Sequence, residues 1–174
     1  MHLRYKKVLT GAAEKQLIAV VGVGNTLAGD DGAGVEAVRR LREKWEGTPG
    51  LLFHIIEGDH FEIADLLDHA ERFIFIDAFA GDRPGIRVRR GKNGRAFAPS
   101  FHQTDISAVM HALEAFGVAT PFPRWEIWGV TISPPAELGE GLSSEVEVGV
   151  KGLCEELSGL LEETIRCVPT MCLR

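Results

Sequence analysis

The chain has 174 residues, of which 45% are hydrophobic, and its formal net charge is −6. This length allows one compact domain with a sizeable core, and the hydrophobic content excludes a disordered or fibrous chain. The mildly acidic charge argues against a nucleic-acid partner, because phosphate backbones are bound by surfaces rich in Lys and Arg. No apolar run approaches the roughly 20 residues that cross a bilayer, so we expect no membrane contact.

The first residues of the chain differ in character from the rest. Residues 1–16 carry four basic side chains but lack the apolar stretch of a signal peptide. We expect them to form a flexible N-terminal extension, followed by one domain over residues 17–168 and a C-terminal tail over residues 169–174.

Three cysteines lie near the C-terminal end: Cys154, Cys167 and Cys172. Their number is odd and they show no CxxC spacing, which argues against a disulfide framework and against a zinc site made of cysteines. Both observations favour a reducing compartment, so we expect a cytoplasmic protein.

The first predicted element is a strand over residues 17–23, a continuous apolar run typical of strands buried on both faces of a parallel sheet. A glycine-rich loop follows, and a helix is predicted to begin near Gly34 and to end before Gly47 and Pro49. Its apolar residues share one side of the helix: Val35, Val38, Leu41 and Trp45.

The next four elements are shorter. Apolar runs predict strands over residues 51–56 and 73–76, with a short helix over residues 63–70 between them. The second of these strands ends at Asp77. Residues 85–90 alternate apolar side chains with arginines, a pattern typical of an edge strand with one solvated face.

The last part of the chain predicts a helix over residues 105–116, capped by Thr104 or Asp105, and a fifth strand over residues 124–132. A loop over residues 133–142 leads to a long amphipathic helix capped by Ser143 or Ser144. Strands that alternate with helices predict a single α/β domain, with a mostly parallel five-stranded twisted sheet and helices on both faces.

Ligands of open α/β sheets bind beyond the carboxyl ends of the strands, and four polar residues are predicted to lie there: Asp30, Asp31, Asp77 and His102. Asp77 follows four apolar residues, and a carboxylate in such a place costs free energy unless a cation or hydrogen-bond donors meet it. A metal ligand and a simple loop cap are both compatible with it.

The other candidates also have two interpretations each. Adjacent side chains in an irregular loop project in different directions, so we expect one of Asp30 and Asp31 to be functional and the other to cap the following helix or hold the loop. A lone loop histidine such as His102 is usually only solvated. Its position before a helix N-terminus favours neutral imidazole, however, which is the form that binds metals.

Two carboxylates and one imidazole suit a borderline divalent ion such as nickel or zinc, with coordination positions left open for substrate or water. The glycines near residue 24 do not make a dinucleotide loop, because Leu27 stands where GxGxxG needs its third glycine and two aspartates would repel a pyrophosphate. No motif for a nucleophilic serine or a helical zinc site is present.

Four segments closely resemble the hydrogenase maturation endopeptidases, a family that trims the C-terminus of the large subunit of nickel–iron hydrogenases after nickel insertion. In chain order the segments are IAVVGVGNTLAGDDGAGVEAVRRL, FIFIDA, SFHQTDISAVMHAL and WEIWGVTI, and the resemblance covers about residues 17–165. It implies that Asp31, Asp77 and His102 contact the metal and carry catalysis, with Asp30 left structural. The chain departs from the family after the second strand, where it has Glu57, Gly58, Asp59 and His60.

The resemblance also implies an unusual mode of recognition. Nickel held by the hydrogenase large-subunit precursor would complete its coordination with Asp31, Asp77 and His102, and another divalent ion such as zinc or cadmium would take its place in a crystal. A non-catalytic, nickel-dependent checkpoint module with the same fold would use the same three ligands, and a nucleotide-binding oxidoreductase is a weaker alternative. The pattern leaves the oligomeric state open. It also leaves open the role of Glu57 and Asp59, whose loop is expected near the cleft, where it would add a carboxylate to the site.

Overall fold

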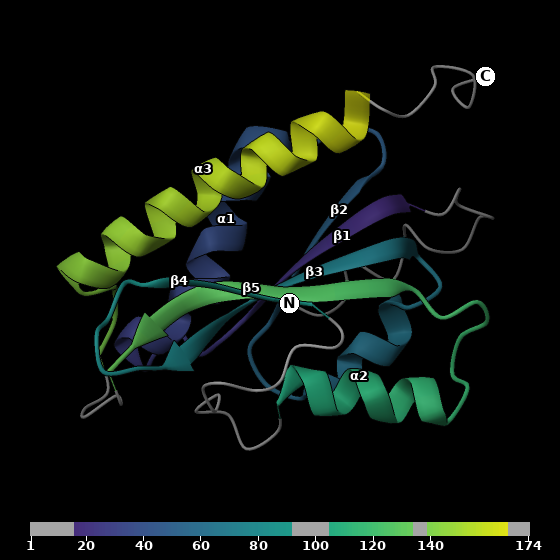
Figure 1. The fold of residues 1–174 in the computed structure, drawn as a ribbon, viewed down its shortest axis with the longest axis horizontal. Coiled ribbons are helices and arrows are strands. Elements are labelled where there is room, and N and C mark those ends of the chain that lie inside the picture. Colours follow the sequence, from purple (N-terminus) through teal and green to yellow (C-terminus); the bar gives the residue numbers. More distant parts are fainter. Residues whose placement is uncertain (1–15, 92–104, 134–138, 167–174) are drawn as a thin grey trace.

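The structure, a computed structural model, describes residues 16–91, 105–133 and 139–166. Five strands form one sheet (Figure 1): β1 (Gln16–Val23), β2 (Leu51–Ile56), β3 (Ala70–Ala80), β4 (Arg87–Gly91) and β5 (Arg124–Ile132). The helices are α1 (Ala33–Trp45), α2 (Ile106–Ala115) and α3 (Ser144–Arg166), and two 3-10 turns are η1 (Gly29–Gly32) and η2 (His60–Leu66). No helix among the described residues is both long and apolar enough to span a membrane.

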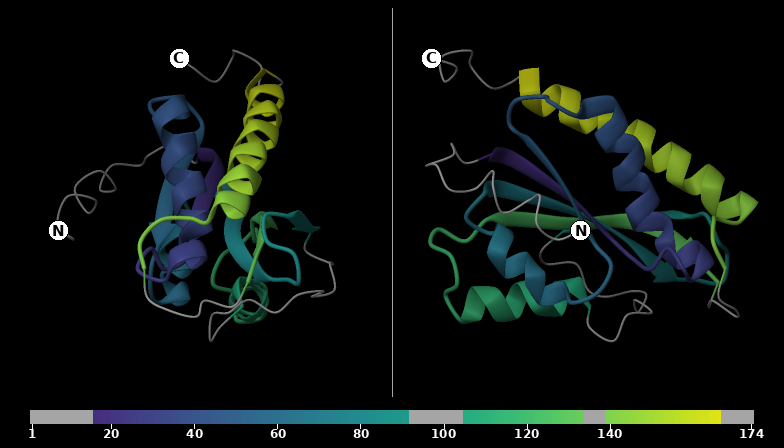
Figure 2. Two further views of the ribbon diagram at one scale, coloured as in Figure 1. Left: turned by 90° about the vertical axis from the view of Figure 1, so that its left-hand side faces the viewer. Right: turned by 180° about the vertical axis from the view of Figure 1, so that it is seen from behind.

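The strands are ordered β2-β1-β3-β5-β4, and all neighbouring pairs are parallel except β4 with β5. Helices α1 and α3 cover one face of the sheet, while α2 and η2 cover the other (Figures 1 and 2). The predicted fold class, a single α/β domain with a mostly parallel five-stranded sheet between helices, is therefore confirmed. The predicted edge strand is confirmed as β4.

A hydrophobic core lies on each face of the sheet, because successive side chains of a buried strand point to opposite faces. In β3, Ile74 and Ile76 belong to the core under α1 and α3, whereas Phe73, Phe75 and Phe79 belong to the core under α2. This alternation places the side chain of Asp77 on the α2 face.

Strand β3 differs from its prediction. It does not end at Asp77 but continues to Ala80, because β5 pairs with it from Arg72↔Arg124 to Ala80↔Ile132. Its pairing with β1, in contrast, stops at Gly22↔Ile76. Asp77 is therefore the first residue of β3 that no longer pairs with β1 but still pairs with β5.

The short helix predicted over residues 63–70 is wrong in type and position. A 3-10 turn forms earlier, at His60–Leu66, because the Asp59 carboxylate caps it by accepting the Phe61 N–H at 2.9 Å. Ala70 already belongs to β3, where it pairs with Gln16. Ile63 and Leu67 are buried as expected, but Leu66 is only half-buried.

Several predicted boundaries are confirmed. Strand β5 spans the predicted residues, and Asp105 caps α2 by accepting the Ser107 N–H at 2.8 Å. Residues 1–15 and 167–174 lie outside the described part of the chain, so the predicted extension and tail stay predictions.

Candidate active site

Asp77 is almost completely buried, with 1% of its surface exposed. Its Oδ1 accepts the N–H of Ala78 at 2.8 Å, which orients the carboxylate at the point where β3 leaves β1. Helix α1 closes the other side of this point. A Cβ on Gly34 in its first turn would lie 2.3 Å from the Val23 carbonyl oxygen and 2.2 Å from that of Ile76, so only glycine allows the helix so close.

Asp31 lies in η1, the turn that joins β1 to α1, and is 5% exposed. The N–H of Asn25, two residues beyond β1, donates to the Asp31 carbonyl oxygen at 3.3 Å, and η1 contacts β3 directly. The structure therefore brings two buried carboxylates, Asp31 and Asp77, to the carboxyl end of β1.

Asp30 faces a different partner. Its Oδ1 accepts the N–H of Ser143 at 2.6 Å, and its Oδ2 accepts the Ser143 hydroxyl at 2.8 Å. Ser143 immediately precedes α3, so Asp30 links the loop after β1 to the start of the last helix. The expectation that one aspartate caps the following helix is wrong, because α1 begins after Gly32 with no side-chain cap.

His102 lies outside the described residues. Helix α2, which follows it in the sequence, covers the same face of the sheet to which Asp77 points. Within residues 16–91, 105–133 and 139–166, no group of three or more His, Cys, Asp and Glu side chains could hold a metal ion. The ligand set of Asp31, Asp77 and His102 thus stays a prediction.

Solved structures of hydrogenase maturation proteases share this fold. The [NiFe] hydrogenase maturation protease HybD from Thermococcus kodakarensis is 27% identical with a TM-score of 0.66, and the match covers 83% of this chain and 99% of that one. An endopeptidase from Escherichia coli is 24% identical with a TM-score of 0.69, covering 86% and 94% of the two chains. The maturation protease HycI from Thermococcus kodakarensis KOD1 is 23% identical with a TM-score of 0.61, covering 86% and 95%.

The last two, below 25% identity, show the shared fold. The first adds sequence identity over nearly the whole of the Thermococcus enzyme. The chain is therefore similar in fold and in sequence to the hydrogenase maturation proteases. No protein-family model matches the chain, and no curated protein matches it in sequence.

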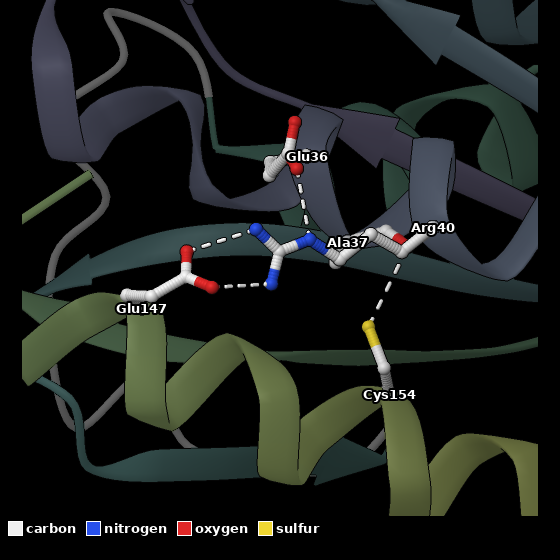
Figure 3. A network of polar contacts seen from close by, with 5 residues as sticks. All are labelled: Glu36, Ala37, Arg40, Glu147 and Cys154. Carbon is white, nitrogen blue, oxygen red and sulfur yellow. Dashed lines mark hydrogen bonds and ion pairs between the residues drawn. The ribbon is translucent and has the colours of Figure 1, made fainter. Parts of the chain in front are cut away.

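A pocket of about 550 Å³ lies between the loop that carries Asp31, the first turns of α1 and the start of α3. Arg40 of α1 forms part of its wall. Its Nε binds Glu36 at 2.8 Å, and its Nη1 and Nη2 bind the two Glu147 oxygens at 2.7 and 2.8 Å (Figure 3). The hydrogen bonds with Glu147 hold the pKa of Arg40 above its ordinary value. The two hydrogen bonds between Arg40 and Glu147 therefore join α1 to α3 at this pocket.

Cys154 of α3 is not suited to act as a nucleophile. Its Sγ donates to the Ala37 carbonyl oxygen at 3.6 Å, and burial raises the pKa of the thiol to about 11 (Figure 3). The thiolate is the reactive form of cysteine, so little of it exists at neutral pH. Cys167 and Cys172 lie outside the described residues.

One contact of the site escaped the sequence analysis. Glu57, in the segment where this chain departs from the family pattern, accepts the Thr26 hydroxyl at 2.5 Å. The two residues are 31 positions apart, and both follow a strand of the parallel sheet. The only sequence signal was that neighbouring parallel strands bring their following loops together.

Proposed function

We propose that this chain is an endopeptidase that removes the C-terminal extension of a nickel–iron hydrogenase large-subunit precursor after nickel insertion. The observation that carries the proposal is the pair of buried carboxylates, Asp31 and Asp77, at the carboxyl end of β1. The 27% identity to the Thermococcus protease HybD supports the class of enzyme and the kind of substrate.

The carboxylate pair is suited to bind a cation. Burying two carboxylates at the carboxyl ends of neighbouring strands costs free energy of solvation, and a divalent ion that binds both carboxylates offsets this cost. Nickel accepts oxygen and imidazole ligands, so we assign His102 as the third ligand. In the proposal nickel belongs to the precursor, and its docking on Asp31, Asp77 and His102 places the scissile bond in the site.

The residues are compatible with two ways of activating the water that attacks the scissile bond. The substrate's nickel lowers the pKa of a bound water, or one of the two carboxylates removes the proton as a general base. A cysteine nucleophile at Cys154 does not fit, because the half-buried thiol has its pKa raised to about 11 and stays protonated at neutral pH. We propose that the enzyme acts in the cytoplasm, in accord with the free thiol of Cys154 and the cysteine spacing.

The proposal predicts that cleavage depends on nickel. Purified wild-type enzyme should shorten nickel-loaded precursor and leave apo precursor intact, because only the loaded form offers an ion to the carboxylates. Intact-mass spectrometry of both precursors, with precursor alone as the control, measures the loss of the extension.

Two results would contradict this expectation. Equal cleavage of both precursors would show that recognition does not pass through nickel. Nickel-dependent binding without cleavage would support the checkpoint module instead.

A further inference from the structure

Glu57 connects the loop after β2 to the loop that carries Asp31. Its Oε1 accepts the Thr26 hydroxyl at 2.5 Å and the Thr26 N–H at 3.3 Å. Glu57 is exposed and Thr26 is half-buried, so the carboxylate reaches from the surface onto the loop. One carboxylate oxygen thus accepts two hydrogen bonds from Thr26, and we call this pair of hydrogen bonds the latch between the two loops.

Thr26 packs directly on the turn that holds Asp31. A Cβ on Gly32 would lie 3.0 Å from the Thr26 Cα and 3.4 Å from its Cγ2. Asn25, the residue before Thr26, donates its N–H to the Asp31 carbonyl oxygen at 3.3 Å. A displacement of Thr26 would therefore be passed to the backbone of Asp31.

The opposite side of this loop is anchored independently of Glu57. Gly29 donates to the Gly139 carbonyl oxygen at 2.6 Å, and Gly139 donates to that of Leu27 at 3.0 Å. The Asp30 carboxylate adds its two hydrogen bonds from Ser143. The loop is thus fixed on the α3 side by several contacts. On the β2 side it is held by the Gly24 N–H, which donates to the Ile56 carbonyl oxygen at 3.3 Å, and by the side chain of Glu57.

We propose that Glu57, acting through Thr26, is a positioning residue that holds Asp31 in place for nickel docking. This inference rests on the proposed function. Glu57 acts on Asp31 through Thr26 and the loop backbone, as outer-shell groups of metal sites do. Loss of such a group typically lowers metal affinity or activity ~10–100-fold.

The test compares variants that remove the latch with variants that keep it. We expect Glu57→Ala and Thr26→Val each to weaken Ni²⁺ binding and precursor cleavage ~10–100-fold. The double variant should be no worse than Glu57→Ala, because that substitution already removes both hydrogen bonds to Thr26. Glu57→Gln keeps a carbonyl acceptor and Thr26→Ser keeps the hydroxyl, so both should stay near wild type. Glu62→Gln, which removes an exposed carboxylate from η2, is the matched control and should not change binding.

Three measurements separate the outcomes: calorimetric titration of the free protein with Ni²⁺, precursor cleavage, and hydrogen exchange of the Asn25 amide. The exchange should be faster in Glu57→Ala and Thr26→Val because the loop is released. Unchanged exchange would overturn the latch, and faster exchange with unchanged Ni²⁺ affinity and cleavage would overturn its positioning role. Should Glu57→Ala fail to fold, Thr26→Val decides, since it removes only the hydroxyl.

Failure of the proposed function would look different. Wild-type enzyme would then leave nickel-loaded precursor uncut, while the exchange measurement on the free protein would still decide whether Glu57 holds the Asp31 loop.

Discussion

Replacing Asp31 by alanine is expected to abolish precursor processing while the fold stays intact. Asp31 and Asp77 are both buried at the carboxyl end of β1, where we propose that both carboxylates bind the substrate's nickel. The loss of a direct ligand should exceed the ~10–100-fold typical of outer-shell changes. Removal of one of two neighbouring carboxylates also relieves repulsion between like charges, so the thermal midpoint should not fall. A processing assay and a thermal melt of Asp31→Ala measure both effects.

Asp30→Ala is the matched control, because it removes the adjacent carboxylate from the same loop. It loses the two hydrogen bonds from Ser143 and should lower the free energy of unfolding by ~1 kcal/mol. Processing by the folded protein should persist. An inactive but stable Asp30→Ala together with an active Asp31→Ala would reverse the roles that we assign to the pair.

Replacing Gly129 by alanine is expected to destabilise the protein by about 3 kcal/mol or more and to displace Asp77. Gly129 of β5 pairs with Asp77 of β3, and a Cβ on it would lie 1.9 Å from the Asp77 carbonyl oxygen and 2.8 Å from Phe79 Cε2. The two strands would have to separate at the residue that the site depends on. Denaturant unfolding and the processing assay should both show a loss.

Gly159→Ala provides the control for this substitution. Gly159 is exposed in α3, and a Cβ there would meet no atom within 4 Å. Because alanine favours a helix over glycine, this variant should be as stable as wild type or more stable by ~1 kcal/mol. Gly129→Ala with wild-type stability and activity would contradict the close approach of β3 and β5 at Asp77.

The sequence correctly predicted the elements that depend on residues close together in the chain. The apolar runs of β1, β2 and β5 and the cap at Asp105 depend on neighbours in the chain, and the structure has them where they were expected. The end of β3 was missed because it depends on a partner strand. Residues 77–80 stay in the sheet through pairing with β5, which lies about 50 residues later in the sequence.

The contacts that hold the loops of the candidate site could not be predicted from the sequence either, because they also join distant parts of the chain. Asp30 and Ser143 are 113 positions apart, and Thr26 and Glu57 are 31 apart. No spacing rule joins such pairs, since only the packed sheet brings their loops together. The sequence located Asp31 and Asp77 at one edge of the sheet because the carboxyl ends of parallel strands share that edge.

The most direct test of the proposed docking site is a crystal structure of the protein with bound Ni²⁺, with the ion located by its anomalous scattering. We expect one ion at the carboxyl end of β1, bound by a carboxylate oxygen of Asp31, a carboxylate oxygen of Asp77 and a ring nitrogen of His102. Before the ion binds, these three groups should lie within about 6 Å of one another, close enough to converge on it after small adjustments. An ion held elsewhere, or His102 on the face opposite Asp77, would contradict the assignment.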